Sequence, residues 1–429
     1  MRCSPWCLQM ESGPIEPADQ PREPGRGYLK GFSALLPVDG SFEGAYSMAA
    51  EDAGFVSTWV GKEGSGYWDL ADYLGGWWGD TFVNGLTRAN GMLPIINLSF
   101  IDREPSTGQL VLSQPAGTDY AGLADPAFRA AYSGAALAAV ATIQPAFLSL
   151  GNEVNRWYEL YGAGENDPNG FQHFVSLYEE TYDAVKRVSP QTTFFCISSR
   201  EIVDQNRQAD MSVLRMLDPP KLDVVVFTSY PFAVQGFNLP SDVPDNYHSS
   251  SVLVDAGLEG KPFGFTELGW SSLPDFGGEE GQAEFLRNVT GRLTKGQGLD
   301  LHLLGWWSLC DLEGAPHRSG LLSNDGRERN QPTRSGRGCS LIQREGGNPH
   351  THRLVAGVGR QGLSEGTRPV GPANTSGRPE AARFFLTGAR VWQRYAAAHG
   401  KTAGLSQIER GEGSKEPSPP CAHSTATAV

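Results

Sequence analysis

Short apolar segments alternate with longer amphipathic ones from residue 28 to residue 326. The apolar segments have the length of buried strands and are bounded by polar or glycine-containing stretches. Eight segments are predicted as strands, at 31–37, 55–60, 92–100, 147–150, 192–197, 222–231, 262–270 and 301–309. The segments between them predict helices, with the strongest patterns at 67–90, 125–143, 170–188, 211–217 and 278–293.

Strands and helices that alternate in this way place the chain in the α/β class. Eight repeats predict a (β/α)8 TIM barrel, a single catalytic domain whose sites lie at the carboxyl ends of the strands. Alternation alone also permits a doubly wound sheet. That fold is disfavoured because no Gly-x-Gly-x-x-Gly turn opens a helix after the first strand.

The composition changes at both ends of the predicted barrel, which occupies residues 28–326. Residues 1–27 are polar and rich in Pro, Glu and Arg, and we expect a disordered leader without the apolar core of a secretory signal. Residues 327–378 carry nine Arg and no Lys, which predicts a disordered insertion. Helical spacing resumes at 379–400 as a candidate last barrel helix, and 401–429 is predicted to be a disordered tail.

The chain of 429 residues has a formal net charge of −13, which argues against nucleic acid and anionic membrane surfaces as partners. No segment is long and apolar enough to span a membrane. The six Cys imply neither a disulfide framework nor a zinc site, and Cys196 is predicted to be a buried thiol. We expect a monomer without a metal ion.

Two predicted strands end on a glutamate, Glu153 after Asn152 and Glu267 after Thr266. Because burial strongly penalises an unpaired charge, each carboxyl should lie at the open end of its strand, facing a cleft. Retaining glycoside hydrolysis uses two carboxyls about 5–5.5 Å apart, one as acid/base and the other as nucleophile. The acid needs a raised pKa, whereas the nucleophile must stay ionised and needs hydrogen-bond donors.

These glutamates and three further motifs resemble clan A glycoside hydrolases over residues 30–325. Ser229-Tyr230-Pro231-Phe232 and Thr266-Glu267-x-x-Trp270 resemble the sixth and seventh strands of endo-β-1,4-galactanases in that clan. Trp307-Ser308-Leu309-x-Asp311 resembles the eighth strand of the clan's β-glucosidases.

The resemblance implies a retaining β-glycosidase that acts on a β-linked glycan or glycoside without a cofactor. It implies that Glu153 is the acid/base, Glu267 the nucleophile and Asn152 a ligand of the sugar 2-hydroxyl. Tyr230 would donate to Glu267, and Trp307 would form the floor of the −1 subsite. It also implies an extracellular location, although no signal peptide is visible.

The chain departs from the clan at the second strand, which ends Trp59-Val60-Gly61 where many members place an arginine near the nucleophile. A transglycosylase would use the same residues. A non-catalytic carbohydrate-binding barrel and a structural or interaction barrel are the alternatives from other classes. Three further tryptophans are candidate sugar platforms, namely Trp59, Trp157 and Trp270.

Overall fold

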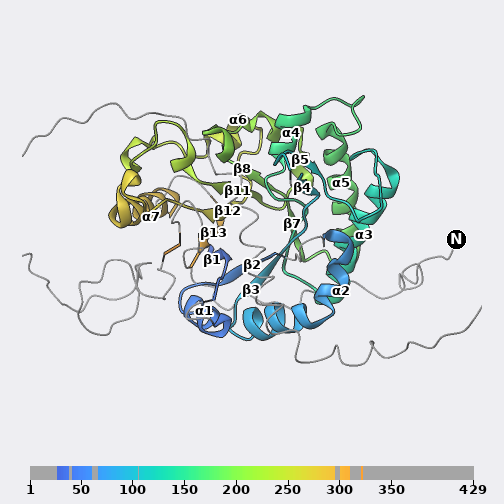
Figure 1. The fold of residues 1–429 in the computed structure, drawn as a ribbon, viewed down its shortest axis with the longest axis horizontal. Helices are drawn as coiled ribbons and strands as arrows, with labels where there is room; N and C mark the ends of the chain where they lie inside the picture. The colour runs from blue at the N-terminus through green and yellow to red at the C-terminus, as the bar shows by residue number, and fades with distance from the viewer. Residues whose placement is uncertain are drawn as a thin grey trace, which may run out of the picture.

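The computed structural model describes residues 27–37, 41–59, 66–104, 106–294, 300–309 and 320–321. The predictions for 1–26, for the insertion at 327–378, for the helix at 379–400 and for the tail lie outside the described residues. Within the described residues, a sheet of parallel strands occupies the middle of the molecule and helices surround it (Figure 1).

The predicted strands are confirmed, with somewhat different bounds. The sheet order is β7-β6-β3-β2-β1-β13-β12-β11-β8. The strands are β1 (Leu29–Ala34), β2 (Phe55–Trp59), β3 (Leu93–Asn97), β6 (Phe147–Ser149), β7 (Thr193–Phe195), β8 (Ile197–Ser199), β11 (Val225–Ser229), β12 (Phe263–Leu268) and β13 (Leu301–Ser308).

The two ends of this sheet meet in one extended segment. β7 and β8 are consecutive and are separated only by Cys196, which is buried as expected. β7 pairs with β6, whereas β8 pairs with β11, so the sheet closes on itself apart from this interruption. The predicted (β/α)8 barrel is therefore confirmed, with β7 and β8 together forming its fifth strand.

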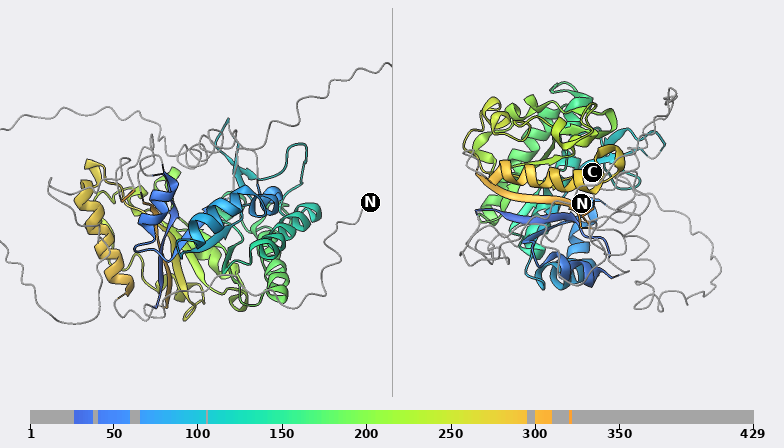
Figure 2. Two further views of the ribbon diagram at one scale, coloured as in Figure 1. Left: turned by 90° about the horizontal axis from the view of Figure 1, so that it is seen from below. Right: turned by 90° about the vertical axis from the view of Figure 1, so that its left-hand side faces the viewer.

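Helices follow the strands and pack on the outside of the barrel. They are α1 (Phe42–Ala49), α2 (Leu70–Leu74), the π-helix η3 (Gly79–Arg88), α3 (Pro126–Ile143), α4 (Asn155–Tyr161), α5 (Phe171–Val188), α6 (Ser251–Asp255) and α7 (Gly278–Thr294). Helix α3 begins as predicted, because the Asp125 carboxylate accepts from the backbone N–H of Ala127 at 2.8 Å, just ahead of the helix. Figure 2 shows α7 on one side of the barrel and α3 with α5 on the other.

Two small hairpins were not predicted from the sequence. β4 (Ile101–Arg103) pairs antiparallel with β5 (Leu110–Leu112), and β9 (Glu201–Ile202) pairs antiparallel with β10 (Arg207–Gln208). Each hairpin follows a barrel strand, the third and the fifth respectively. Both therefore lie at the end of the barrel where a (β/α)8 protein builds its site.

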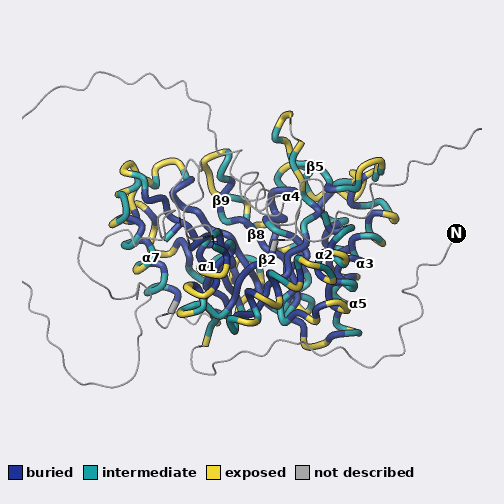
Figure 3. Tube along the Cα trace, turned by 60° about the horizontal axis from the view of Figure 1, so that its bottom comes forward, coloured by how far each residue is buried: buried dark blue, intermediate teal, exposed yellow. Residues whose placement is uncertain are grey.

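The barrel interior has its own small apolar core, separate from the larger core beneath the helices. Strands around the whole barrel contribute to it: Phe55, Leu93, Ile95, Phe195, Ile197, Val224, Val226 and Leu303. Successive side chains of a strand point to opposite faces, so the inward positions nearer the carboxyl ends include Ser33, Asn97, Thr228 and Trp307. Figure 3 shows the strands buried and the exposed segments at the periphery.

Gly305 permits close contact between β13 and β12. A Cβ at this position would lie 2.3 Å from the backbone oxygen of Thr266 and 3.0 Å from the Phe55 ring. We therefore predict that Gly305→Ala lowers the free energy of unfolding by about 1–3 kcal/mol, because a backbone atom must move. Gly134→Ala is the matched control, since nothing lies within 4 Å of its Cβ and α3 gains from alanine. Urea unfolding measures both, and equal effects of the two substitutions would contradict the prediction.

Candidate active site

A β-bulge turns Glu267 into the barrel. Phe265 pairs with Phe227 and belongs to the outer core, so an unbroken strand would also point Glu267 outward. The register shifts by one residue at Thr266, and Glu267 pairs with the inward position Thr228. The bulged backbone of Thr266 lies against Gly305. The direction of the glutamate therefore depends on one irregularity in β12.

Glu267 is fully buried and accepts hydrogen bonds from two hydroxyl groups. The Tyr230 hydroxyl donates to Oε2 at 2.5 Å, and the Ser33 hydroxyl donates to Oε1 at 3.0 Å. Burial, followed by the charge of Glu153, raises the pKa of Glu267 to about 8, although both hydroxyl groups act in the opposite direction. Burial also raises the pKa of Tyr230 well above its usual value, so its hydroxyl remains a donor.

Glu153 follows β6 in a tight turn. Its backbone is left-handed, with φ of 51°, an arrangement that costs a non-glycine residue about 1 kcal/mol or more. Two backbone bonds to β8 fix this turn, from Ile197 N to Gly151 O at 2.9 Å and from Val154 N to Ile197 O at 3.0 Å. The strain lies on a buried carboxylate, which is typical of a functional position.

Thr228 is adjacent to both glutamates. Its hydroxyl donates to Glu153 Oε1 at 2.9 Å, and its backbone pairs with Glu267 in the barrel. The two carboxyls are also close enough for the charge of Glu153 to raise the pKa of Glu267. The structure thus brings together the two glutamates that the sequence singled out.

Arg156 is part of the site, although no motif distinguishes it from a surface arginine of α4. Its Nη1 lies 3.0 Å from Glu153 Oε2, and both side chains are only 6% exposed. Its Nη2 lies 2.8 Å from Asp204 Oδ1, and Asp204 Oδ2 lies 3.6 Å from Nη1 of Arg103 on β4. Burial acts to lower the pKa of Arg156, but Glu153 and Asp204 outweigh it, and the net direction is upward. The guanidinium therefore remains charged beside Glu153.

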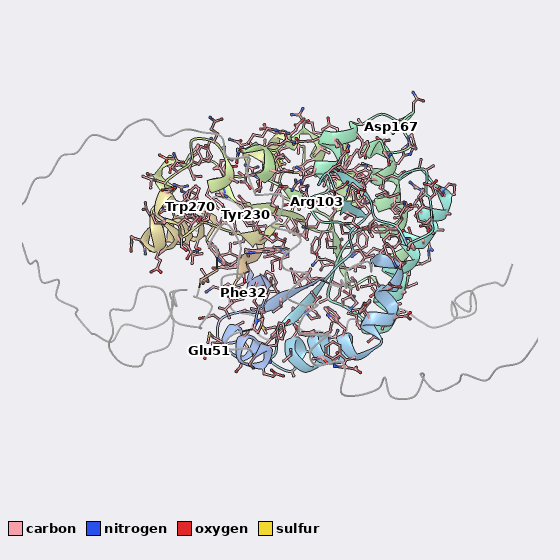
Figure 4. The ribbon with its side chains drawn as sticks, viewed as in Figure 1. Phe32, Glu51, Arg103, Asp167, Tyr230 and Trp270 are labelled. Atoms are coloured by element: carbon pink, nitrogen blue, oxygen red, sulfur yellow. The ribbon has the colours of Figure 1, made fainter. Side chains whose placement is uncertain are left out.

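Asn152 precedes Glu153 in the chain, and Trp307 packs against Tyr230. The Oδ1 atom of Asn152 is buried and has no hydrogen-bond partner among the described residues, so it can accept from a ligand hydroxyl. The ring of Trp307 is partly buried and meets the Tyr230 ring edge to face, with centroids 6.3 Å apart. In Figure 4, Tyr230 and Arg103 lie toward the middle of the molecule, whereas Trp270 lies nearer α7.

Trp157 and Trp270 were expected as sugar platforms, and the structure corrects this. Both indoles are fully buried. Trp157 packs against Phe100 and donates to Asn169 O at 2.7 Å, while Trp270 stacks on Phe285 and donates to Phe276 O at 3.0 Å. Neither ring has a face open to a ligand, so both belong to the core. The Trp59 backbone ends β2, and its side chain lies outside what the structure describes.

Within the described ranges, no group of three or more His, Cys, Asp or Glu side chains is arranged to hold a metal ion. In the same part of the chain, no helix has the length and apolar character needed to cross a membrane.

No protein-family model matches the sequence, and a search of curated proteins finds no match. Solved structures do match. β-Glucuronidase from Bifidobacterium dentium, complexed with coumarin-3-O-glucuronide, aligns with 70% of this chain and 44% of its own at 15% identity and a TM-score of 0.44.

Two further matches are a fungal β-1,4-galactanase and GH5_18 from Streptomyces cattleya in complex with GlcNAc. The galactanase aligns with 74% of this chain and 97% of its own, at 17% identity and a TM-score of 0.45. GH5_18 aligns with 71% of this chain and 77% of its own, at 17% identity and a TM-score of 0.49. The chain spans less than half of the glucuronidase. The pairing of the strands establishes the barrel independently of these matches.

Proposed function

We propose that the protein is a retaining glycoside hydrolase that cleaves β-glycosidic bonds by double displacement. One observation carries the proposal: two buried glutamates, Glu153 and Glu267, follow the fourth strand and end the seventh strand of one barrel, and Thr228 contacts both. Two neighbouring carboxyls are what this chemistry needs, one to protonate the leaving oxygen and one to attack the anomeric carbon.

In this proposal Glu267 is the nucleophile. It accepts hydrogen bonds from the hydroxyl groups of Tyr230 and Ser33. These bonds stabilise its ionised form, as a nucleophile requires. Glu153 is the acid/base, and Asn152 beside it offers a buried acceptor to a sugar hydroxyl. Trp307, adjacent to Tyr230, would form an apolar floor for the sugar ring.

Burial opposes ionisation of Glu267 and raises its pKa to about 8, whereas the hydroxyl groups of Tyr230 and Ser33 act in the opposite direction. Double displacement needs an ionised nucleophile and a proton on the acid/base. In the proposed cycle, the positive charge that develops at the anomeric carbon favours ionised Glu267, and Glu153 gives its proton to the leaving oxygen as the glycosidic bond breaks.

Reducing-sugar release from β-glucans, β-galactans, β-mannans and xylans tests the proposal and identifies the sugar class. Proton NMR of the first product formed then reports the anomeric configuration. We expect release from at least one substrate class with retention of configuration. Inversion would contradict the double-displacement mechanism. Binding of a glycan without release by the folded protein would instead support a carbohydrate-binding barrel.

A further inference from the structure

A third buried glutamate contacts Tyr230 and takes no part in the mechanism above. Glu201, in β9 just beyond the fifth barrel strand, is fully buried and accepts three hydrogen bonds. Ser229 Oγ donates to its Oε1 at 2.9 Å, the Tyr247 hydroxyl donates to Oε1 at 2.8 Å, and the backbone N–H of Tyr230 donates to Oε2 at 2.6 Å.

Two of these three donors, Ser229 and Tyr230, belong to the segment whose Tyr230 hydroxyl contacts the proposed nucleophile. Tyr230 directly follows β11, and its backbone has irregular dihedrals, with φ of −133° and ψ of 69°. Its backbone N–H is directed at the carboxylate of Glu201. The same residue's hydroxyl reaches Glu267. Glu201 therefore fixes one end of Tyr230 while the other end contacts the nucleophile.

We propose that Glu201 is a positioning residue of the reaction: it holds the backbone of Tyr230 so that the Tyr230 hydroxyl remains on Glu267. The inference rests on the proposed function for its effect on turnover. Its structural part, the dependence of the Tyr230–Glu267 contact on Glu201, can be tested without any turnover.

The chemistry of the cluster explains why a carboxylate occupies this position. All three groups that face it are donors, and an ionised carboxylate offers only acceptors. Glutamine would direct a donor NH2 group at one side of the cluster, so at least one of the three bonds would be lost. A shift of about 1 Å in a residue that contacts the reacting groups is enough to cost on the order of 10²-fold in rate.

The first test compares Glu201→Gln with Tyr230→Phe and with the double variant. We expect Glu201→Gln to lower kcat by about 10–100-fold with little change in KM, because the Tyr230 contact acts on the chemical step. In the Tyr230→Phe background the same substitution should lower kcat by less than about threefold further, because the hydroxyl through which Glu201 acts is absent. Independent, multiplicative losses in the double variant would overturn the proposal.

Tyr247→Phe is the matched control. It removes one hydrogen bond to Oε1 of Glu201 and leaves the bond from Tyr230 N to Oε2 in place. We expect kcat within about threefold of the native value. A loss as large as that of Glu201→Gln would show that general integrity of the cluster, rather than the position of Tyr230, controls the rate.

The second test does not require activity, so it separates failure of this inference from failure of the proposed function. Carboxyl 13C NMR with labelled glutamate follows the titration of Glu267, assigned by the signal missing in Glu267→Gln. The Tyr230 hydroxyl lowers the pKa of Glu267. Glu201→Gln should therefore raise the Glu267 midpoint, and Tyr230→Phe should abolish that effect. An unchanged midpoint, or a change that persists in Tyr230→Phe, would overturn the proposal.

Discussion

Replacing Glu267 by glutamine is expected to lower kcat by three or more orders of magnitude while the protein stays folded. The amide is nearly isosteric, so the barrel is preserved, but it cannot form a glycosyl-enzyme ester. Reducing-sugar release by native protein and variant, at matched concentrations and with circular dichroism to confirm folding, measures the effect. Glu165→Gln in the loop after α4 is the matched control, since this glutamate is exposed and away from the barrel strands. A Glu267→Gln variant with more than about a tenth of native activity would contradict the assignment.

The same substitution should change how the free energy of unfolding depends on pH. The pKa of Glu267 is raised from 4.5 to about 8, so the folded state binds more protons than the unfolded state between these values. The free energy of unfolding of the native protein therefore falls as pH rises from about 4.5 to about 8. Glu267→Gln removes this group and should flatten the fall, leaving the contribution of Glu201, whose pKa burial raises to about 7. Urea unfolding from pH 5 to pH 8 measures both slopes.

Replacing Arg156 by methionine is expected to lower the free energy of unfolding by about 3 kcal/mol. The substitution leaves Glu153 buried without its cation, whereas Met retains much of the apolar packing of the arginine stem. Glu153→Gln in the same molecule should recover part of the loss, because the unpaired charge is then removed as well. Urea unfolding of the single and double variants gives this coupling.

The exposed pair of Arg287 with Glu280 provides the control for this comparison. These side chains are 59% and 77% exposed, so Arg287→Met should cost less than about 1 kcal/mol. Equal costs at the two arginines would contradict a structural role of the buried pair.

The fold and the two glutamates could be predicted from the sequence because each depends on local patterns. Eight apolar runs separated by helical segments predict an α/β fold, and the absence of a Gly-x-Gly-x-x-Gly turn after the first strand favours a barrel over a doubly wound sheet. A glutamate at the end of an apolar strand is unusual because of its burial cost, so Glu153 and Glu267 were conspicuous. The hydrogen bond from Tyr230 to Glu267 was also expected, because the motif around Tyr230 resembles the sixth strand of the galactanases.

The remaining features depend on contacts between distant segments. The bulge at Thr266 turns Glu267 inward only because Gly305, on the neighbouring strand, leaves room for it. Arg156 resembles any helix arginine until α4 places it on Glu153, and Ser33 and Glu201 carry no local motif. Trp157 and Trp270 have the composition of sugar platforms, yet three-dimensional packing assigns both to the core.

Covalent trapping of the glycosyl-enzyme tests the central claim most directly. The protein would be incubated with a 2-deoxy-2-fluoro-β-glycoside of the sugar class that it releases, digested, and mapped by mass spectrometry. The account predicts a single label on the peptide that carries Glu267 and no label in Glu267→Gln. A label on Glu153, or turnover of the substrate without any label on Glu267, would contradict it.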